Sequence, residues 1–187
     1  EPCQGNCGAI EPLPGFLELI RKQTKEHGTV FILDEVKTGF RIANGGAQEY
    51  YRIQPDLATY AKAIGNGYPV AAFGGSREIM SIIGHGVSQG GTYTNNKPGI
   101  AAAFATLSLM RTKPILKTIE QRGKRLMDGL KEIFEDNDIP AVFSGYPAMF
   151  SFAFGVDKVT CQRDWAASDQ AVYLKLTEEA IERGVMP

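Results

Sequence analysis

The sequence has 187 residues, with 20 basic and 21 acidic side chains and a formal net charge of -1. A chain of this length forms one large domain, or one domain and part of another. Its balanced charge provides no basic field for nucleic acid, and no run of uncharged apolar residues is long enough to cross a membrane. The amino terminus has no charged region followed by an apolar core, so the sequence predicts a cytoplasmic protein without a signal peptide.

The first predicted elements alternate between helix and strand. Residues 14–27 have an apolar patch at helical spacing, and Gly28 follows as a helix stop. Strands are expected at 29–33, 56–60 and 70–73, because each is a short apolar or β-favouring run bounded by Gly or Pro. This alternation is typical of an α/β fold with a mostly parallel sheet.

The pattern changes beyond residue 112. Residues 113–136 carry apolar side chains at helical spacing and are expected to form a long connecting helix. Residues 141–154 are rich in β-favouring side chains, and 168–183 form a further predicted helix with Ser168 as its cap and Gly184 as its stop. We therefore predict a large domain over 1–112, a connecting helix over 113–136 and the start of a smaller α+β domain over 137–187.

The three cysteines and two histidines do not indicate a metal site. Cys3, Cys7 and Cys161 lack the two close pairs that structural zinc sites use. His27 lies at a predicted helix end, where a polar side chain suits the helix dipole, and His85 lies between two glycines in a predicted loop. No metal is expected.

Two residues in the first half indicate cofactor chemistry. Asp34 ends an apolar strand, so its carboxylate is expected at the carboxyl edge of the sheet, where open α/β folds bind ligands. A desolvated carboxylate needs a cationic partner, and the protonated ring nitrogen of pyridoxal phosphate would provide one. Lys62 follows, before a Gly-rich turn, and its amine could form a Schiff base with the same cofactor. Taken alone, an Asp after an apolar strand is most often a helix cap or turn residue, and a single lysine is more often a surface residue than a catalytic one.

The order of several short motifs is more specific than either residue. The sequence resembles the class III aminotransferases, which are fold-type-I pyridoxal-phosphate enzymes, and in particular their glutamate-1-semialdehyde aminomutase branch. The motifs that carry the resemblance are Glu1-Pro2, Asp34-Glu35-Val36, Thr38-Gly39-Phe40-Arg41, Gly45-Gly46-Ala47-Gln48, Pro55-Asp56-Leu57, Lys62-Ala63-Ile64-Gly65, Ala72-Phe73-Gly74-Gly75, Glu78-Ile79-Met80 and Gly91-Thr92.

The resemblance implies a role for each matching position. Asp34 would pair with the pyridine nitrogen, Val36 would pack on the ring, and Lys62 would bind the cofactor covalently and then act as the base. Thr92, with the backbone beside it at Gly91, would reach the phosphate of a cofactor held by a neighbouring subunit, which implies a homodimer with shared sites. Glu1 matches an acid near the substrate.

Departures from the family pattern leave alternatives open. Lys37 stands where many members have Gln or Met, and it is a rival to Lys62 as the cofactor lysine. Residues 93–98 lack the Gly-Asn-Pro that is common after the Gly-Thr pair, which bears on substrate choice. Family members are considerably longer, so we expect a fragment without the amino-terminal phosphate loop.

Three functions remain after this comparison of motifs. The first is an aminomutase that moves an amino group between adjacent carbons of glutamate semialdehyde. The second is an aminotransferase that exchanges amino groups between an amine or β-amino acid and a keto acid. The third is a non-catalytic segment that dimerises or packs against the missing half.

Overall fold

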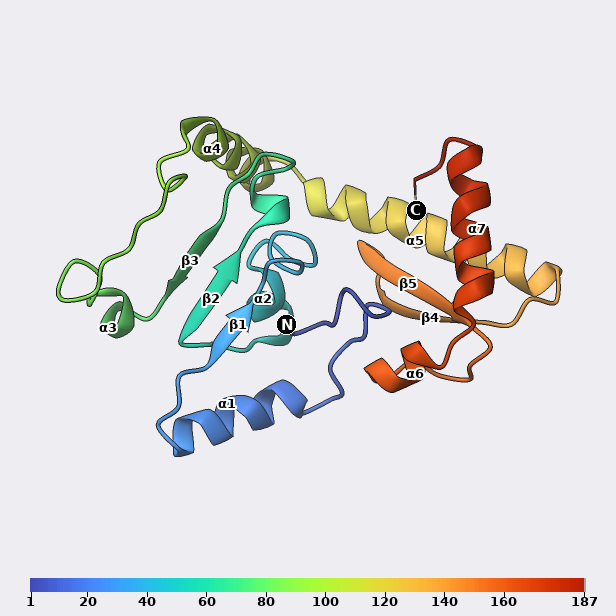
Figure 1. Ribbon diagram of the computed structural model, residues 1–187, viewed down its shortest axis with the longest axis horizontal. Helices are drawn as coiled ribbons and strands as arrows, with labels where there is room; N and C mark the ends of the chain where they lie inside the picture. The colour runs from blue at the N-terminus through green and yellow to red at the C-terminus, as the bar shows by residue number, and fades with distance from the viewer. Residues whose placement is uncertain (187) are drawn as a thin grey trace. The chain divides into compact units, whose positions relative to one another are not determined.

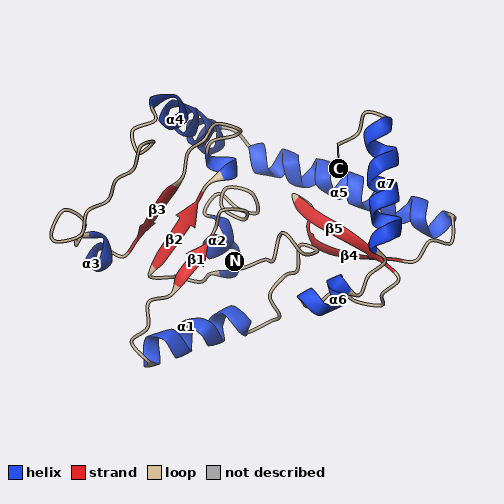
Figure 2. Ribbon diagram, viewed as in Figure 1, coloured by secondary structure: helices blue, strands red, loops and turns tan. Residues whose placement is uncertain are grey.

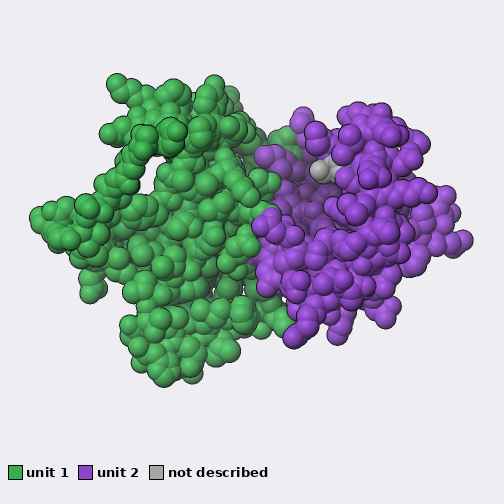
Figure 3. Space-filling view, in the orientation of Figure 1, with its two compact units in different colours: residues 1–2, 12–118 green, residues 3–11, 119–187 purple. Residues whose placement is uncertain are grey.

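The computed structural model describes residues 1–186. Its internal contacts divide the chain into two compact units (Figure 3): unit 1 contains residues 1–2 and 12–118, and unit 2 contains residues 3–11 and 119–187. A short segment near the amino terminus thus belongs with the carboxyl-terminal part of the chain, which the sequence does not indicate. The three-part domain division at residues 112 and 136 stays a prediction.

Unit 1 is built on a three-stranded sheet of β1 (Ile32–Asp34), β2 (Leu57–Tyr60) and β3 (Ala72–Gly75), in that order (Figure 2). β1 and β2 are parallel, as expected, whereas β3 is antiparallel to β2. A parallel return would need a crossover of about a dozen residues or more, usually through a helix. Residues 61–71 contain only one short 3-10 turn, so the chain reverses direction instead.

Helices complete this unit (Figure 1). They are α1 (Phe16–Glu26), α2 (Gly46–Tyr51), the 3-10 helix η1 (Lys62–Ile64), α3 (Arg77–Met80) and α4 (Lys97–Thr112). One residue from each of four elements meets in the core: Leu17 of α1, Leu33 of β1, Ala47 of α2 and Ala58 of β2 are all buried. Burial of these apolar side chains fixes α1 and α2 against the sheet.

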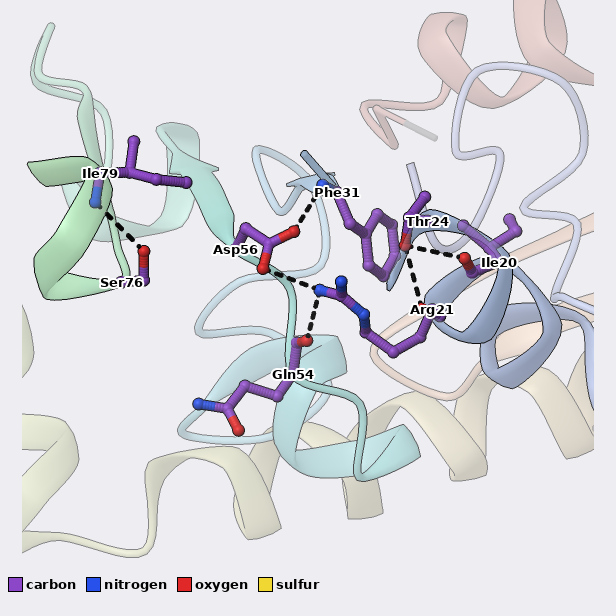
Figure 4. A network of polar contacts seen from close by, with 8 residues as sticks. All are labelled: Ile20, Arg21, Thr24, Phe31, Gln54, Asp56, Ser76 and Ile79. Atoms are coloured by element: carbon purple, nitrogen blue, oxygen red, sulfur yellow. Dashed lines mark hydrogen bonds and ion pairs between the residues drawn. The ribbon is translucent and has the colours of Figure 1, made fainter. Parts of the chain in front are cut away.

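An ion pair fastens α1 to the start of the sheet (Figure 4). Arg21 Nη1 lies 3.0 Å from Asp56 Oδ1, and Arg21 also donates to the backbone oxygen of Gln54 at 3.3 Å. The other carboxylate oxygen of Asp56 accepts the Phe31 N–H at 2.7 Å. These hydrogen bonds, first from the Phe31 backbone and then from Arg21, lower the pKa of Asp56 below its ordinary value of 3.8. Asp56 thereby links the residue before β1 to the residue before β2.

Unit 2 consists of a hairpin and helices. β4 (Ala141–Tyr146) and β5 (Met149–Phe154) pair in antiparallel register, and α6 (Gln162–Ala166) and α7 (Gln170–Glu182) follow. Most of the long helix α5 (Ile115–Asp136) also belongs to this unit. Phe134 of α5 packs against Phe143, Phe152 and Phe154 of the hairpin, with ring centroids 5.4 to 5.9 Å apart. Aromatic packing therefore joins the end of α5 to the hairpin.

Three local expectations need correction. The first strand begins at Ile32 rather than Thr29, because the Thr29 N–H still donates to Thr24 O in the turn after α1. The third strand lies at 72–75 rather than 70–73. The cap of α7 is Asp169, not Ser168: the Asp169 carboxylate accepts the N–H groups of Ala171 and Val172, whereas the Ser168 hydroxyl donates to Trp165 O. No helix within residues 1–186 is both long and apolar enough to span a bilayer.

Candidate active site at the strand ends

Asp34 lies at the carboxyl end of β1 in a half-buried position. Its Oδ1 atom accepts the Val36 N–H at 2.9 Å and the Thr59 hydroxyl at 3.2 Å. The first bond closes a tight turn directly after the strand, and the second crosses to the neighbouring strand. Oδ2 accepts no hydrogen bond from any residue of the described chain. One carboxylate oxygen is thus fixed in place while the other is available to a ligand.

Lys62 lies near the same edge of the sheet. Asp34 is paired in register with Thr59 of β2, and Lys62 follows Thr59 by three residues. Because β1 and β2 are parallel, their carboxyl ends meet at one edge, where ligands bind in open α/β sheets. The Lys62 amine is exposed and makes no ion pair or hydrogen bond within residues 1–186. Its φ of 50° is unusual for a residue with a side chain.

The residue after Asp34 is a second carboxylate with a different environment. Glu35 is fully buried. Its Oε2 atom accepts the Thr38 hydroxyl at 2.6 Å and the Ala47 N–H at 2.8 Å, and its Oε1 atom accepts from both nitrogens of Gln48, at 3.0 and 3.2 Å. Four donors thus compensate for the loss of water around this charge. Glu35 ties the loop after β1 to the first turn of α2.

Gly46 is required for this arrangement. Its φ of +67° is a left-handed conformation, and a Cβ atom there would overlap the Glu35 carboxylate, with Cδ only 2.8 Å away. Glycine alone allows the start of α2 to approach the buried charge so closely. The last three residues of the Gly-Gly-Ala-Gln motif, 46–48, therefore all lie against the Glu35 carboxylate.

Tyr60, the last residue of β2, is connected to Glu35 through Gln48. Gln48 Nε2 donates to the Tyr60 hydroxyl at 2.7 Å as well as to Glu35. The Tyr60 ring also packs against Phe40, with centroids 5.4 Å apart. Burial, followed by the nearby Glu35 charge, raises the pKa of Tyr60 above its ordinary value of 10.0, despite the opposing hydrogen bond from Gln48. The phenol therefore stays neutral near pH 7.

The remaining predicted site residues are placed differently. Val36 is half-buried beside Asp34, which suits either ring packing or ordinary core packing. Gly91 and Thr92 lie in the exposed loop between α3 and α4, and Glu1 is exposed at the amino end. Within residues 1–186, none of Gly91, Thr92 and Glu1 makes a hydrogen bond or an ion pair with Asp34 or Lys62, so their roles stay predictions.

The strand-end residues fit a pyridoxal phosphate cofactor in their chemistry. The cofactor needs an acceptor for its protonated ring nitrogen and an amine for its aldehyde. Asp34 Oδ2, at the end of β1, accepts no hydrogen bond within the described residues, and Lys62 Nζ, in the 3-10 turn just after β2, is an unpaired amine there. Lys37, the rival lysine, is half-buried and follows Val36 in the turn after β1. Lys62 remains the better candidate because its amine is exposed and unpaired.

The sequence interpretation missed several supporting residues. It gave no role to Thr59, Glu35, Gln48 or Tyr60, although Glu35 and Gln48 lie in the quoted motifs. Thr59 could have been found from the strand register, since it pairs with Asp34. The contact between Glu35 and Gln48 joins residues thirteen positions apart, which no local pattern reveals.

Comparison with known proteins agrees with this geometry. The family model for class III aminotransferases matches residues 1–186. Glutamate-1-semialdehyde 2,1-aminomutases from Desulfosudis oleivorans and Methanothermobacter thermautotrophicus are 40% and 39% identical over 187 residues, which cover 99% of this chain and 44% of each relative. The chain thus spans less than half the length of these relatives.

Solved structures give the same result for the fold. An omega-transaminase from Sphaerobacter thermophilus has a TM-score of 0.88 at 29% identity, covering 100% of this chain and 44% of that protein. A β-phenylalanine aminotransferase from Variovorax paradoxus has a TM-score of 0.88 at 28% identity, covering 99% and 44%. These likenesses confirm the predicted α/β fold of the fold-type-I transferases. The chain belongs to the class III aminotransferase family.

Proposed function

We propose that the protein containing this chain is a pyridoxal-phosphate-dependent enzyme that transfers amino groups. The observation that carries the proposal is the placement of Asp34 at the end of β1 and of Lys62 two residues after the end of the parallel strand β2, each with an atom left available to a ligand. The cofactor would supply an electron sink for charge that develops on the substrate carbon. Family membership supports the same chemistry.

The chain's own residues would divide the work. Asp34 Oδ2 would accept a hydrogen bond from the protonated ring nitrogen. The Val36 N–H and the Thr59 hydroxyl donate to Oδ1 and so fix the orientation of the carboxylate toward the ring. Lys62 Nζ would hold the cofactor and, once displaced by the substrate amine, would move a proton at the substrate carbon. The Val36 side chain would pack against one face of the cofactor ring.

For the substrate, we favour a glutamate-1-semialdehyde aminomutase. Support comes from the two relatives with that name, which are 40% and 39% identical across the chain. An aminotransferase for amines or β-amino acids is the alternative, supported by structures of such enzymes at 29% and 28% identity. Both share the Asp34 and Lys62 chemistry and differ in whether a second keto acid is needed.

We also propose a homodimer with shared sites. Gly91 and Thr92 lie in an exposed loop between α3 and α4, which suits a role at the phosphate held by a second subunit. Small amino and keto compounds would be the substrates. A cytoplasmic location is part of the same proposal.

A turnover experiment tests the proposal. The complete gene product is loaded with pyridoxal phosphate and given glutamate 1-semialdehyde without a keto acid. An aminomutase isomerises the substrate over many turnovers, whereas a transaminase stops after about one equivalent per site and resumes when a keto acid is added. A protein that binds the cofactor but transfers no amino group from these or from β-amino acid donors would contradict the proposal.

A further inference from the structure

We propose that Glu35 is a positioning residue that acts through Gln48 and Tyr60 on the backbone that carries Lys62. The inference rests on the proposed function, because it assigns a task to Lys62. It links the residue directly after Asp34 with the residue two positions before Lys62 by a continuous path of side-chain hydrogen bonds, Glu35 to Gln48 to Tyr60.

The first link of this path is rigid. Glu35 is fully buried and accepts from Thr38, Ala47 and Gln48, so neither oxygen can move without losing a hydrogen bond. Leaving a buried charge without such partners costs several kcal/mol. The Glu35 carboxylate is therefore a fixed point behind the end of β1.

The second link transfers this rigidity to β2. Gln48 Nε2 has two hydrogens, and it donates to two acceptors, Glu35 Oε1 and the Tyr60 hydroxyl. Both donors are in use, so the side-chain amide has one orientation. The Tyr60 ring is further confined by Phe40 at 5.4 Å and by Gly39, where a Cβ atom would come within 2.8 Å of the ring.

The third link reaches Lys62 through the backbone. Thr59 directs its hydroxyl to Asp34, and because successive strand residues point to opposite faces, Tyr60 lies on the other face of the sheet. After Tyr60, Ala61 is extended and Lys62 has a φ of 50°. Such a conformation persists only where the surroundings impose it. Tyr60 therefore stabilises this turn from the face of the sheet opposite to the one that carries the Thr59 hydroxyl and the proposed cofactor.

The experiment uses the complete gene product and two substitutions that interrupt the path while leaving Glu35 bound, Gln48→Met and Tyr60→Phe. Thr38→Val is the matched control, because it removes one buried hydrogen bond to Glu35 but leaves the Gln48 and Tyr60 links intact. We would measure the rate at which Lys62 captures pyridoxal phosphate, using borohydride trapping and peptide mapping at successive times. The values of kcat and KM would be measured on the same variants.

We expect Gln48→Met and Tyr60→Phe each to slow capture at Lys62 and lower kcat by at least about tenfold, with KM little changed, since a misplacement of about 1 Å can cost up to about 100-fold. Thr38→Val should lower the melting temperature and leave the capture rate unchanged. The double variant should be no slower than the slower single variant, because both changes break one path.

Four outcomes would count against the account. Equal capture rates in all variants, or a loss in Thr38→Val as large as in Tyr60→Phe, would overturn the positioning role and leave a purely structural network. Additive losses in the double variant would also overturn it. If the unmodified protein itself fails to capture the cofactor at Lys62, the proposed function fails. This failure is distinguishable from a failure of the positioning role, because it is seen before any substitution is made.

Discussion

Asp34 and Thr59 face each other across the parallel ladder of β1 and β2, and the Thr59 hydroxyl donates to Asp34 Oδ1 at 3.2 Å. This bond acts together with the Val36 N–H on the same oxygen, at 2.9 Å. Both donors bind Oδ1, so Oδ2 is the atom that we propose for a cationic ligand. The relationship explains how a half-buried carboxylate is oriented without being neutralised by the protein.

Replacing this carboxylate tests its role. Asp34→Asn should leave the cofactor bound, because the Lys62 amine is intact, but should lower kcat by roughly 100-fold or more, since the ring nitrogen loses its ionic partner. Thr59→Val is the control and should cost less than about tenfold, because Val36 still holds Oδ1. Measured turnover in Asp34→Asn equal to that of the parent would remove Asp34 from the mechanism.

The Arg21 and Asp56 pair should make stability depend on pH at the acidic end. The folded pKa of Asp56 lies below 3.8, so its contribution is fully present above pH 3.8 and is lost as pH falls through the lower folded value. Asp56→Asn should reduce the free energy of unfolding by about 1 kcal/mol at pH 7. The difference in melting temperature from the parent should shrink below pH 3.8.

Asp128→Asn is the control for this prediction. The Lys124 and Asp128 pair is at a similar distance, 2.9 Å, but its side chains are 68% and 52% exposed, against 22% and 30% for Arg21 and Asp56. An exposed pair between i and i+4 contributes only about 0.3 to 0.5 kcal/mol. Equal losses in the two variants would show that α1 is not fastened through Asp56.

Gly46→Ala should destabilise the protein by more than about 2 kcal/mol, since it adds overlap with Glu35 to the cost of a left-handed residue. Gly28→Ala is the matched control: its φ is +60° and nothing lies within 4 Å of the added Cβ, so only about 1 kcal/mol is expected. Thermal melts compare the two. A Gly46→Ala protein as stable as Gly28→Ala would contradict the close packing of α2 on Glu35.

The cap of α7 gives a test in unit 2. Asp169→Ala should cost about 1 kcal/mol, because the N–H groups of Ala171 and Val172 lose their acceptor. Asp169→Asn, which keeps a side-chain oxygen, should lose much less. Melting temperatures of the two variants, compared with the parent, distinguish a cap from a surface acid, for which both changes would be neutral.

The sequence predicts elements well where the signal is local. The helix ending near His27 is predicted from apolar spacing and from Gly28. The long helix predicted over 113–136 from apolar spacing is observed at Ile115–Asp136. Ser168 and Asp169 show the limit of such reasoning: adjacent residues are both good caps, and only the backbone path decides between them. The direction of β3 likewise follows from the length of its connection, not from its own residues.

The site is predictable in part for a similar reason. Asp34 and Lys62 are proposed from motifs, because the proposed cofactor chemistry requires a carboxylate and an amine. The network of Glu35, Gln48 and Tyr60 depends on contacts twelve and thirteen positions apart along the chain. A buried Glu next to a half-buried Asp has no local signature, so its partners become visible only once β1, α2 and β2 are placed together.

Covalent labelling tests the central claim most directly. The complete gene product is incubated with pyridoxal phosphate, reduced with borohydride, and digested for mass spectrometry, with Lys62→Ala and Lys37→Ala run in parallel. The account predicts label on the Lys62 peptide in the parent and in Lys37→Ala, and none in Lys62→Ala. Label on Lys37, or unchanged stoichiometry of labelling in Lys62→Ala, would contradict it.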